Sequence, residues 1–289
     1  MLSKTNKTIA VHLHIYYEEM WSELAGCLGA LQGHDYDLFV TLVKPNAELE
    51  GKIKAFKPTA KIFVIENRGY DVGAFIYVLN HINLNNYDYV IKLHTKRNLQ
   101  QKVSDIGNGF GCLGGMWREW LLSFMQPRHL EKCLLALAKN PHLGVCCYYK
   151  CIHPIENFRG ISAEARERYK DYMFGLPSYS FVAGTMFIMR ADLLTDIQKM
   201  SIKQELFDEP DARHSMQFAH IMERTLGEVV YAHHCHIQDV FTPFAGVRRA
   251  FWLSLRYLKR FLFQKKITKS NKLVIKICKL PIYSGSITR

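Results

Sequence analysis

The sequence contains two short polar segments whose residue types suit the binding of a phosphate. In the first, ENRGYDVG, Arg68 can form a bidentate contact with an anion, and Asp71 can accept hydrogen bonds from ribose or sugar hydroxyls. Gly69 and Gly73 would let the backbone come close to a ligand. A helical pattern follows, and its first turn would add free amides and the positive end of a helix dipole. A structural turn with a capping aspartate explains this segment alone equally well.

The second segment, KLHTK, ends the apolar run YDYVI. Because side chains alternate along a strand, Lys92, His94 and Lys96 should point to one side, and Leu93 and Thr95 to the other. A lysine here can neutralise phosphate charge, and a histidine can donate a hydrogen bond or ligate a metal. For KLHTK alone, a solvated strand end is the better interpretation. Two such segments at neighbouring strand ends favour a binding site.

Strands and helices alternate through the first third of the chain. Hydrophobic periodicity predicts strands at residues 8–17, 36–43, 60–67 and 87–95, and helices at about 20–32, 47–56 and 74–82. This order implies a parallel sheet with helices on its faces, in which ligands bind at the carboxyl ends of the strands. Both polar segments lie at such ends.

The rest of the chain has a more mixed pattern. It predicts helices at residues 114–125, 130–140 and 211–227, and strands at 144–149, 181–190 and 228–237. We therefore expect a single α/β domain of residues 1–245 with a mostly parallel sheet, followed by a tail of residues 246–289. The longest uncharged run, residues 172–189, contains proline and glycine, so it predicts a loop leading into a strand rather than a membrane span.

The net charge of +12 is confined to the tail. All twelve charged residues after Asp239 are basic, which leaves 26 basic residues to balance the 26 acidic ones. The body of the protein is thus neutral, and we expect no nucleic-acid partner. The eight cysteines are scattered without a CxxC pair, and the N-terminal segment has no cleavage site of the signal-peptide type. These features predict a cytoplasmic protein.

The tail begins with a predicted basic amphipathic helix, RRAFWLSLRYLKRFLF. Its apolar stripe consists of Phe251, Leu255, Leu258 and Leu262, and the cations that cluster opposite are Arg249, Arg256 and Arg260. Such a helix suits an anionic membrane surface. Docking of the helix on the rest of the chain and a nucleic-acid patch are the alternatives.

Five segments in a fixed order resemble the motifs of the rhamnan synthesis F family: ENRGYDVGAF, YDYVIKLHTKR, GGMWREWLL, AGTMFIMR and HIMERTLG. The resemblance covers roughly residues 9–236. It implies a GT-A-like, Rossmann-type domain and a nucleotide-sugar-dependent glycosyltransferase (a hexosyltransferase). The implied donor is dTDP-rhamnose or UDP-galactofuranose, and the implied acceptor is a lipid-linked glycan. The product would be a bacterial surface polysaccharide (the O-antigen of lipopolysaccharide, a capsule or a cell-wall rhamnan), made on the inner face of the plasma membrane.

The resemblance also implies roles for single residues. Those expected to bind the donor are Asn67, Arg68, Gly69, Asp71, Lys92, His94, Thr95 and Lys96. Those expected near the acceptor or a phosphate are Trp117, Arg118, Gly184, Thr185, His220, Glu223 and Arg224. Core packing is an equally good role for Trp117. The HxxER segment, which consists of residues 220–224 and contains His220, Glu223 and Arg224, could equally well form a buried polar brace.

An inverting transfer needs a carboxylate base. The segment ELFDEPDARH places Glu209 and Asp211 where related enzymes supply that base, with Asp208 and Glu205 as reserves. A solvated acidic loop is the alternative, and a retaining transfer would need no such base.

The segment HTK stands where other GT-A enzymes carry acidic metal ligands. We therefore expect no resident metal, with positive charge supplied by Lys96, Lys92 and Arg68; a divalent ion, Mg²⁺ or Mn²⁺, held by His94 and His236 is the alternative. The missing acidic pair also permits a second function, that of a non-catalytic carbohydrate-binding or scaffold protein in polysaccharide assembly.

Overall fold

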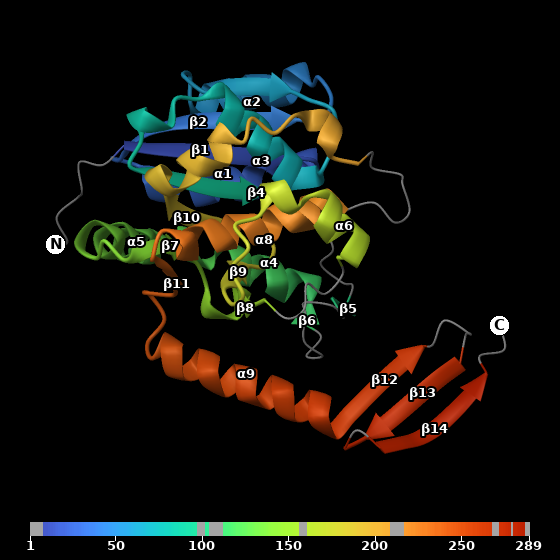
Figure 1. The fold of residues 1–289 in the computed structure, drawn as a ribbon. Helices are drawn as coiled ribbons and strands as arrows, with labels where there is room; N and C mark the ends of the chain where they lie inside the picture. Colours follow the sequence, from blue (N-terminus) through green and yellow to red (C-terminus); the bar gives the residue numbers. More distant parts are fainter. Residues whose placement is uncertain are drawn as a thin grey trace.

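A mixed seven-stranded sheet forms the centre of the computed structural model, which describes residues 8–96, 102–103, 112–155, 161–208, 217–267, 272–278 and 280–286 (Figure 1). The strands of this sheet are β1 (Thr8–Ile15), β2 (Asp35–Leu42), β3 (Lys61–Val64), β4 (Tyr89–His94), β7 (Leu143–Cys146), β10 (Phe187–Arg190) and β11 (His236–Gln238). They lie in the order β11-β7-β10-β4-β1-β2-β3. Only β10 is antiparallel to its neighbours, so the predicted mostly parallel α/β sheet is confirmed.

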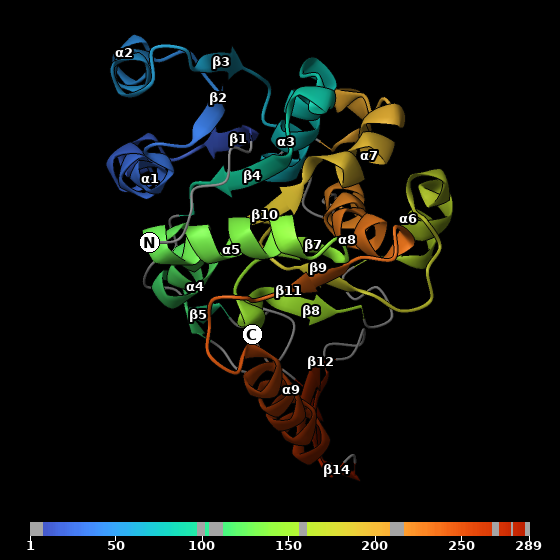
Figure 2. The same ribbon diagram turned by 90° about the vertical axis from the view of Figure 1, so that its left-hand side faces the viewer.

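Helices cover both faces of this sheet. The larger ones are α1 (Trp21–Leu28), α2 (Ala47–Phe56), α3 (Tyr70–His81), α5 (Pro127–Lys139) and α8 (Gln217–Ala232). Figure 2 shows α3 and α8 on one side of the sheet and α1 and α2 on the other, as expected because the crossovers to β2 and to β4 run in opposite directions. Shorter elements complete the body: α4 (Gly114–Leu122), α6 (Ala163–Arg168), α7 (Thr195–Lys199), β5 (Lys102–Val103), β6 (Cys112–Leu113), β8 (Ile152–Pro154) and β9 (Ser180–Val182).

Local sequence explains where these helices begin and which side they bury. In α2, the side chain of Asn46 caps the helix by accepting a hydrogen bond from the Leu49 amide. In α5, which begins with a proline, the buried residues Leu130, Cys133, Leu134 and Leu137 follow the spacing of one helical face. Helix α3 is buried over most of its surface, because the sheet, α7 and α8 all contact it.

Two predicted strands differ from the structure. The segment at residues 181–190 is split into β9 and β10 because Gly184 and Thr185 between them have left-handed φ angles of 81° and 49°. Residues 228–232 belong to α8 instead of a closing strand, and only His236–Gln238 form β11. Val229 and Val230 continue the buried face of α8 that includes Leu226, so helical periodicity prevails over their β propensity.

The tail comprises a helix and a small sheet that project from the body (Figures 1 and 2). Helix α9 (Ala245–Leu262) is followed by the antiparallel strands β12 (Phe263–Ile267), β13 (Lys272–Ile277) and β14 (Leu280–Ser286). The helix was predicted, whereas the three strands were not. No helix in the described part of the chain is long and apolar enough to span a bilayer.

Helix α9 docks on the body through the side that carries Arg249 and Trp252. Arg249 donates hydrogen bonds to the Ile152 carbonyl (3.3 Å) and the Ser180 hydroxyl (3.1 Å), and the Trp252 ring lies 5.8 Å from that of His153. Arg249 therefore holds the helix to β8 and β9, instead of joining a free cationic face as predicted. The opposite side is exposed, as the fractions of 70% for Val247 and 65% for Phe251 show.

Candidate functional site

A cavity of about 240 Å³ lies at the carboxyl ends of β1 and β4. The residues that line it are His14, Tyr16, Tyr17, Asn67, Tyr70, Asp71, His94, Thr95 and Lys96. From β1 the chain proceeds to β2 and β3 on one side, and it returns through α3 to β4 on the other. The cavity thus occupies the switch point of the sheet, where open α/β sheets bind their ligands.

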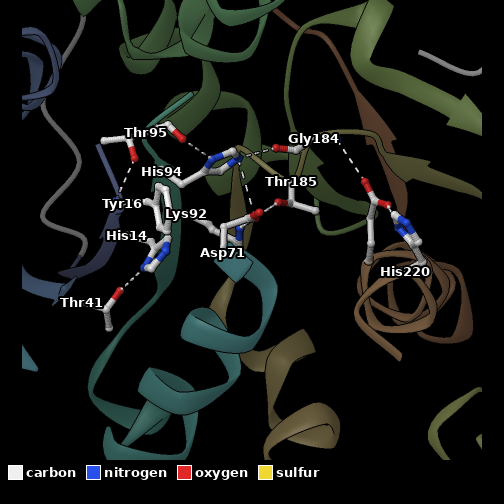
Figure 3. A network of polar contacts seen from close by, with 11 residues as sticks. His14, Tyr16, Thr41, Asp71, Lys92, His94, Thr95, Gly184, Thr185 and His220 are labelled. Carbon is white, nitrogen blue, oxygen red and sulfur yellow. Dashed lines mark hydrogen bonds and ion pairs between the residues drawn. The ribbon is translucent and has the colours of Figure 1, made fainter. Parts of the chain in front are cut away.

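An ion pair beneath the cavity joins three distant parts of the sequence (Figure 3). The ammonium of Lys92, whose side chain is 0% exposed, donates to Asp71 Oδ2 at 2.6 Å and to Thr185 Oγ1 at 2.7 Å. Thr185 Oγ1 donates in turn to the same carboxylate oxygen at 2.5 Å. Burial opposes the charge of Asp71, but His94 and Lys92 outweigh it and hold the pKa of this carboxyl far below its usual value. Lys92 is thereby committed to Asp71 and does not line the cavity, contrary to its predicted contact with the donor.

His94 lines the cavity beside Asp71, with its Nε2 3.7 Å from Asp71 Oδ2. Its Nε2 is 2.9 Å from the Gly184 carbonyl oxygen, and its Nδ1 is 3.1 Å from the Thr95 carbonyl oxygen. Burial lowers the pKa of His94, with Asp71 opposing that effect. Because both ring nitrogens face carbonyl oxygens of the protein, His94 is better placed to fix the Gly184 turn than to ligate a metal.

A second histidine comes from β1 and was not predicted. His14 lies beside His94 in the sheet register, and its Nδ1 is 2.9 Å from the hydroxyl of Thr41 on β2. His12 Nε2 is 3.0 Å from the same hydroxyl, which can donate to only one of the two rings and accept from the other. Burial lowers the pKa of His14 to about 3, so the ring that lines the cavity is neutral at pH 7.

Thr95 fixes the turn that follows β1. Its hydroxyl accepts hydrogen bonds from the amides of Tyr16 (3.0 Å) and Tyr17 (3.1 Å), and it is buried. The two tyrosine rings meet edge to face at 4.9 Å and both line the cavity. The segment HIYY of the sequence held the signal for these residues, because it ends the strand that pairs with YDYVIKLH.

The turn before α3 is shaped by packing within the protein. Gly69 has a φ of 68°, and a Cβ there would lie 2.2 Å from the Phe207 ring; a Cβ on Gly73 would lie 1.9 Å from the Arg68 carbonyl oxygen. The predicted close approach of these glycines is thus to the protein rather than to a ligand. Arg68 binds Glu66 Oε2 at 2.7 Å and lines a different cavity, so it does not act as the predicted anion clamp in the first one.

Lys96 is the only lysine or arginine that lines the first cavity within the described residues. Arg118 lies behind it, with Nε 3.0 Å from Glu23 Oε1 and Nη1 3.5 Å from the Lys96 carbonyl oxygen. Trp117 is 3% exposed, and its ring leaves no room for a Cβ on Gly184. Trp117 therefore packs in the core, and Arg118 supports Lys96 from a position outside the cavity.

The HxxER segment braces the far side of the site. Glu223 Oε1 accepts a hydrogen bond from the Gly184 amide at 3.1 Å, and Oε2 lies 3.7 Å from His220 Nδ1; Gly184 and His220 are labelled in Figure 3. Glu223 Oε2 also lies 2.9 Å from Arg224 Nη1. Burial would raise the pKa of Glu223, but His220 and Arg224 lower it below the usual value. Helix α8 thus holds the left-handed Gly184–Thr185 turn, whose threonine completes the buried ion pair.

The described residues do not fit a resident divalent metal. None of them form a group of three or more His, Cys, Asp or Glu side chains that could hold one. Asp71 is the only carboxylate lining the first cavity among them, and its Oδ2 is occupied by Lys92 and Thr185. His236 begins β11 whereas His94 ends β4, and the two strands run in the same direction, so these histidines lie at opposite ends of the sheet. The predicted bases Glu209 and Asp211 lie outside the described residues.

The fold and the site together define an α/β protein with a cavity at the switch point of a mostly parallel sheet. The chain belongs to the rhamnan synthesis protein F family, whose sequence profile matches residues 1–235. It is also 27% identical over 176 residues to the uncharacterized protein WxcX from two strains of Xanthomonas campestris pathovar campestris. That match covers 59% of this chain and 24% of WxcX, so the chain spans about a quarter of the length of these relatives.

One solved structure, from Desulfovibrio desulfuricans, is described as a nucleotide-diphospho-sugar transferase. It shares 14% identity with this chain, covers 81% of it and 80% of its own length, and superposes with a TM-score of 0.28. A similarity of this size supports no conclusion about fold or function.

Proposed function

We propose that the protein is a GT-A-like glycosyltransferase that transfers a sugar, of the rhamnose or galactofuranose class, from a nucleotide sugar to a growing bacterial surface polysaccharide. The observation that carries the proposal is the cavity at the switch point of the sheet, which exposes one lysine above an already neutralised ion pair. Membership of the rhamnan synthesis protein F family supports the link to polysaccharide synthesis.

The charge of the cavity suits the diphosphate of such a donor. Asp71 is compensated by Lys92, and His14 is neutral, so the ammonium of Lys96 sets the net charge of the described lining. A lysine provides a compact point charge for a phosphate. The volume of about 240 Å³ is below the usual range for small-molecule sites, so we expect the cavity to enclose only part of the nucleotide sugar.

Polar groups of the lining can orient the remaining parts of the donor. Asn67 Oδ1 is a buried acceptor without a hydrogen-bond partner among the described residues, and it suits a sugar hydroxyl. Tyr16 and Tyr17 add aromatic rings to the lining of the cavity, on which a base or a sugar ring can stack. The carboxylate base of an inverting transfer is assigned to Glu209 or Asp211.

The proposed site of action is the inner face of the plasma membrane, where a lipid-linked acceptor would be available. The exposed side of α9 supports this location, since Val247, Phe251, Leu255, Leu258 and Leu262 follow one helical stripe and all are exposed. The tail around this stripe carries twelve cations and no acidic residue. An apolar stripe within a basic segment complements an anionic lipid surface.

A test of this function combines the full chain with dTDP-rhamnose or UDP-galactofuranose and a lipid-linked acceptor, with and without EDTA. We expect donor hydrolysis or transfer, and its persistence in EDTA, because the described residues offer no acidic metal site. Failure to bind either nucleotide would contradict the proposal. Binding without turnover would favour the second function, a non-catalytic carbohydrate-binding or scaffold protein, which the shortage of carboxylates in the described lining supports.

A further inference from the structure

A second cavity, of about 560 Å³, lies on the other side of the turn that leads into α3. Asn67, Tyr70 and Asp71 of this turn line the first cavity, whereas Arg68 lines the second. The ring of Phe207, which packs on Gly69 between them, also lines the second cavity. The two cavities are therefore neighbours that share one rigid turn, and the second has the volume of an ordinary small-molecule site.

The wall of the second cavity is an aromatic cluster built around Phe218 of α8. The ring of this buried residue lies 4.6 Å from Tyr169, 5.1 Å from Tyr172 and 4.9 Å from Phe207, and all three of these residues line the cavity. The two tyrosines are half-buried. Rings fixed in this way provide flat apolar surfaces on which a sugar ring can stack.

The backbone that carries the tyrosines is also fixed. The Thr225 hydroxyl donates to the Tyr172 carbonyl oxygen at 3.0 Å. The carboxylate of Glu228, which is 0% exposed, accepts from the amides of Phe174 (3.0 Å) and Leu176 (2.6 Å). Helix α8 therefore positions both this wall and, through Glu223, the Gly184 turn of the first cavity.

The charges around the second cavity differ from those around the first. Arg68 and Arg168 contribute two positive charges, and Asp171, Glu205 and Asp208 contribute three negative ones. The net charge of these side chains is negative, so it does not favour the binding of a phosphate. A lining that combines guanidinium donors with carboxylate acceptors instead suits the hydroxyl groups of an uncharged carbohydrate.

We propose that the second cavity binds an uncharged segment of the acceptor glycan, with a sugar ring stacked on Tyr169 or Tyr172. This inference rests on the proposed glycosyltransferase function. The shared turn would bring the end of the glycan next to the donor, as a transfer reaction requires. Glu205 and Asp208, which the sequence offers as reserve bases, then face the acceptor.

The test measures binding of phosphate-free rhamnose and galactofuranose oligosaccharides to the full chain by calorimetry and ligand-observed NMR, with UDP and dTDP as probes of the first cavity. We expect Tyr169→Ala or Tyr172→Ala to weaken oligosaccharide binding about fivefold or more, since a stacked ring is lost. The matched Tyr→Phe variants should retain most of it. Lys96→Ala should leave the affinity for oligosaccharides unchanged. If the tyrosine variants keep the nucleotide affinity of the original chain, they are folded.

The inference is overturned if neither alanine variant weakens oligosaccharide binding, or if the unaltered chain binds nucleotides but no oligosaccharide. The chain could also bind oligosaccharides in a tyrosine-dependent way but bind no nucleotide. That result would support the second site and contradict only the proposed donor site. Absence of both kinds of binding would contradict both.

Discussion

The Lys92–Asp71 pair decides how the site can handle charge. A lysine that is 0% exposed is stable in its charged form only with a partner, and Asp71 and Thr185 surround its ammonium. The pair leaves Lys96 as the lysine available to a ligand in the described lining. The sequence motif KLHTK thus combines one structural lysine and one lysine at the cavity.

Removing the buried cation should cost stability. We expect Lys92→Met to lower the free energy of unfolding by about 3 kcal/mol or more, because Asp71 is left without its partner. The double variant Lys92→Met/Asp71→Asn should recover part of this loss. Urea denaturation measures both values, and a single variant as stable as the original chain would contradict the ion-pair assignment.

Gly69 is needed for steric reasons. Gly69→Ala would place a methyl group 2.2 Å from the Phe207 ring at a φ of 68°, so we expect a loss of stability and weaker binding in both cavities. Gly26 in α1 is the matched control, with nothing within 4 Å of its added Cβ. Gly26→Ala should instead stabilise the protein by about 0.5–1 kcal/mol. Thermal denaturation of the two variants compares them directly, and equal midpoints would contradict this assignment.

Several cavity residues could be predicted from sequence, but their partners could not. Alternation along the strand correctly placed Lys92 and His94 on one face, and both contact Asp71. That Lys92 is buried depends on Thr185, which reaches Asp71 only because β10 lies beside β4. A pairing between residues that are 93 positions apart leaves no local signal.

At the scale of elements, β1 brings two neutral histidines into the sheet. Burial lowers the pKa of His12 well below the usual value and that of His14 to about 3, next to Lys92, His94 and Asp71. In the unfolded chain both rings gain a proton near pH 6.5. The unfolded state therefore binds more protons between about pH 6.5 and pH 3, and stability must fall as the pH is lowered through this range.

The variant His14→Asn should reduce this pH dependence, since an amide can keep the bond to Thr41 without titrating. We expect its free energy of unfolding to fall less steeply, by up to about 1.4 kcal/mol per pH unit. Asp71 acts at lower pH than the histidines. Its pKa is lowered, so its contribution to stability is retained above about pH 3.9 and lost only at lower pH. Parallel stability curves for the variant and the original chain would contradict a neutral, buried His14.

Element types were predictable where periodicity was strong, as in the first four strands. At β9, β10 and the end of α8, tertiary packing overrides the local pattern. Gly184 must adopt a left-handed conformation beside Trp117, and this interrupts an apolar run that otherwise predicts one strand. The role of the residues HIYY depends on tertiary structure for a similar reason, because an apolar run shows the strand but not which other strand ends lie next to it.

At the scale of the whole molecule, the body holds both cavities and α9 presents a separate apolar surface. The double variant Phe251→Ser/Leu258→Ser should reduce binding to phosphatidylglycerol vesicles by about tenfold or more, since each side chain loses its transfer free energy. Salt at about 0.5 M should weaken binding of the unaltered chain by screening the cations of the tail. Val64→Ser, which alters an exposed apolar residue on β3, is the control. Cosedimentation that responds to neither change would contradict the membrane role.

We expect Lys96 to meet the diphosphate of a nucleotide sugar without a resident metal. The most direct measurement is the calorimetric affinity of the full chain for UDP and dTDP in EDTA, compared with Lys96→Ala and with Lys44→Ala, which removes a lysine that is 70% exposed outside the cavity. We predict that Lys96→Ala loses about tenfold or more in affinity, as expected for a charge-assisted contact, whereas Lys44→Ala is unchanged. Equal affinities of Lys96→Ala and the original chain, or nucleotide binding that disappears in EDTA, would contradict this metal-free role of Lys96.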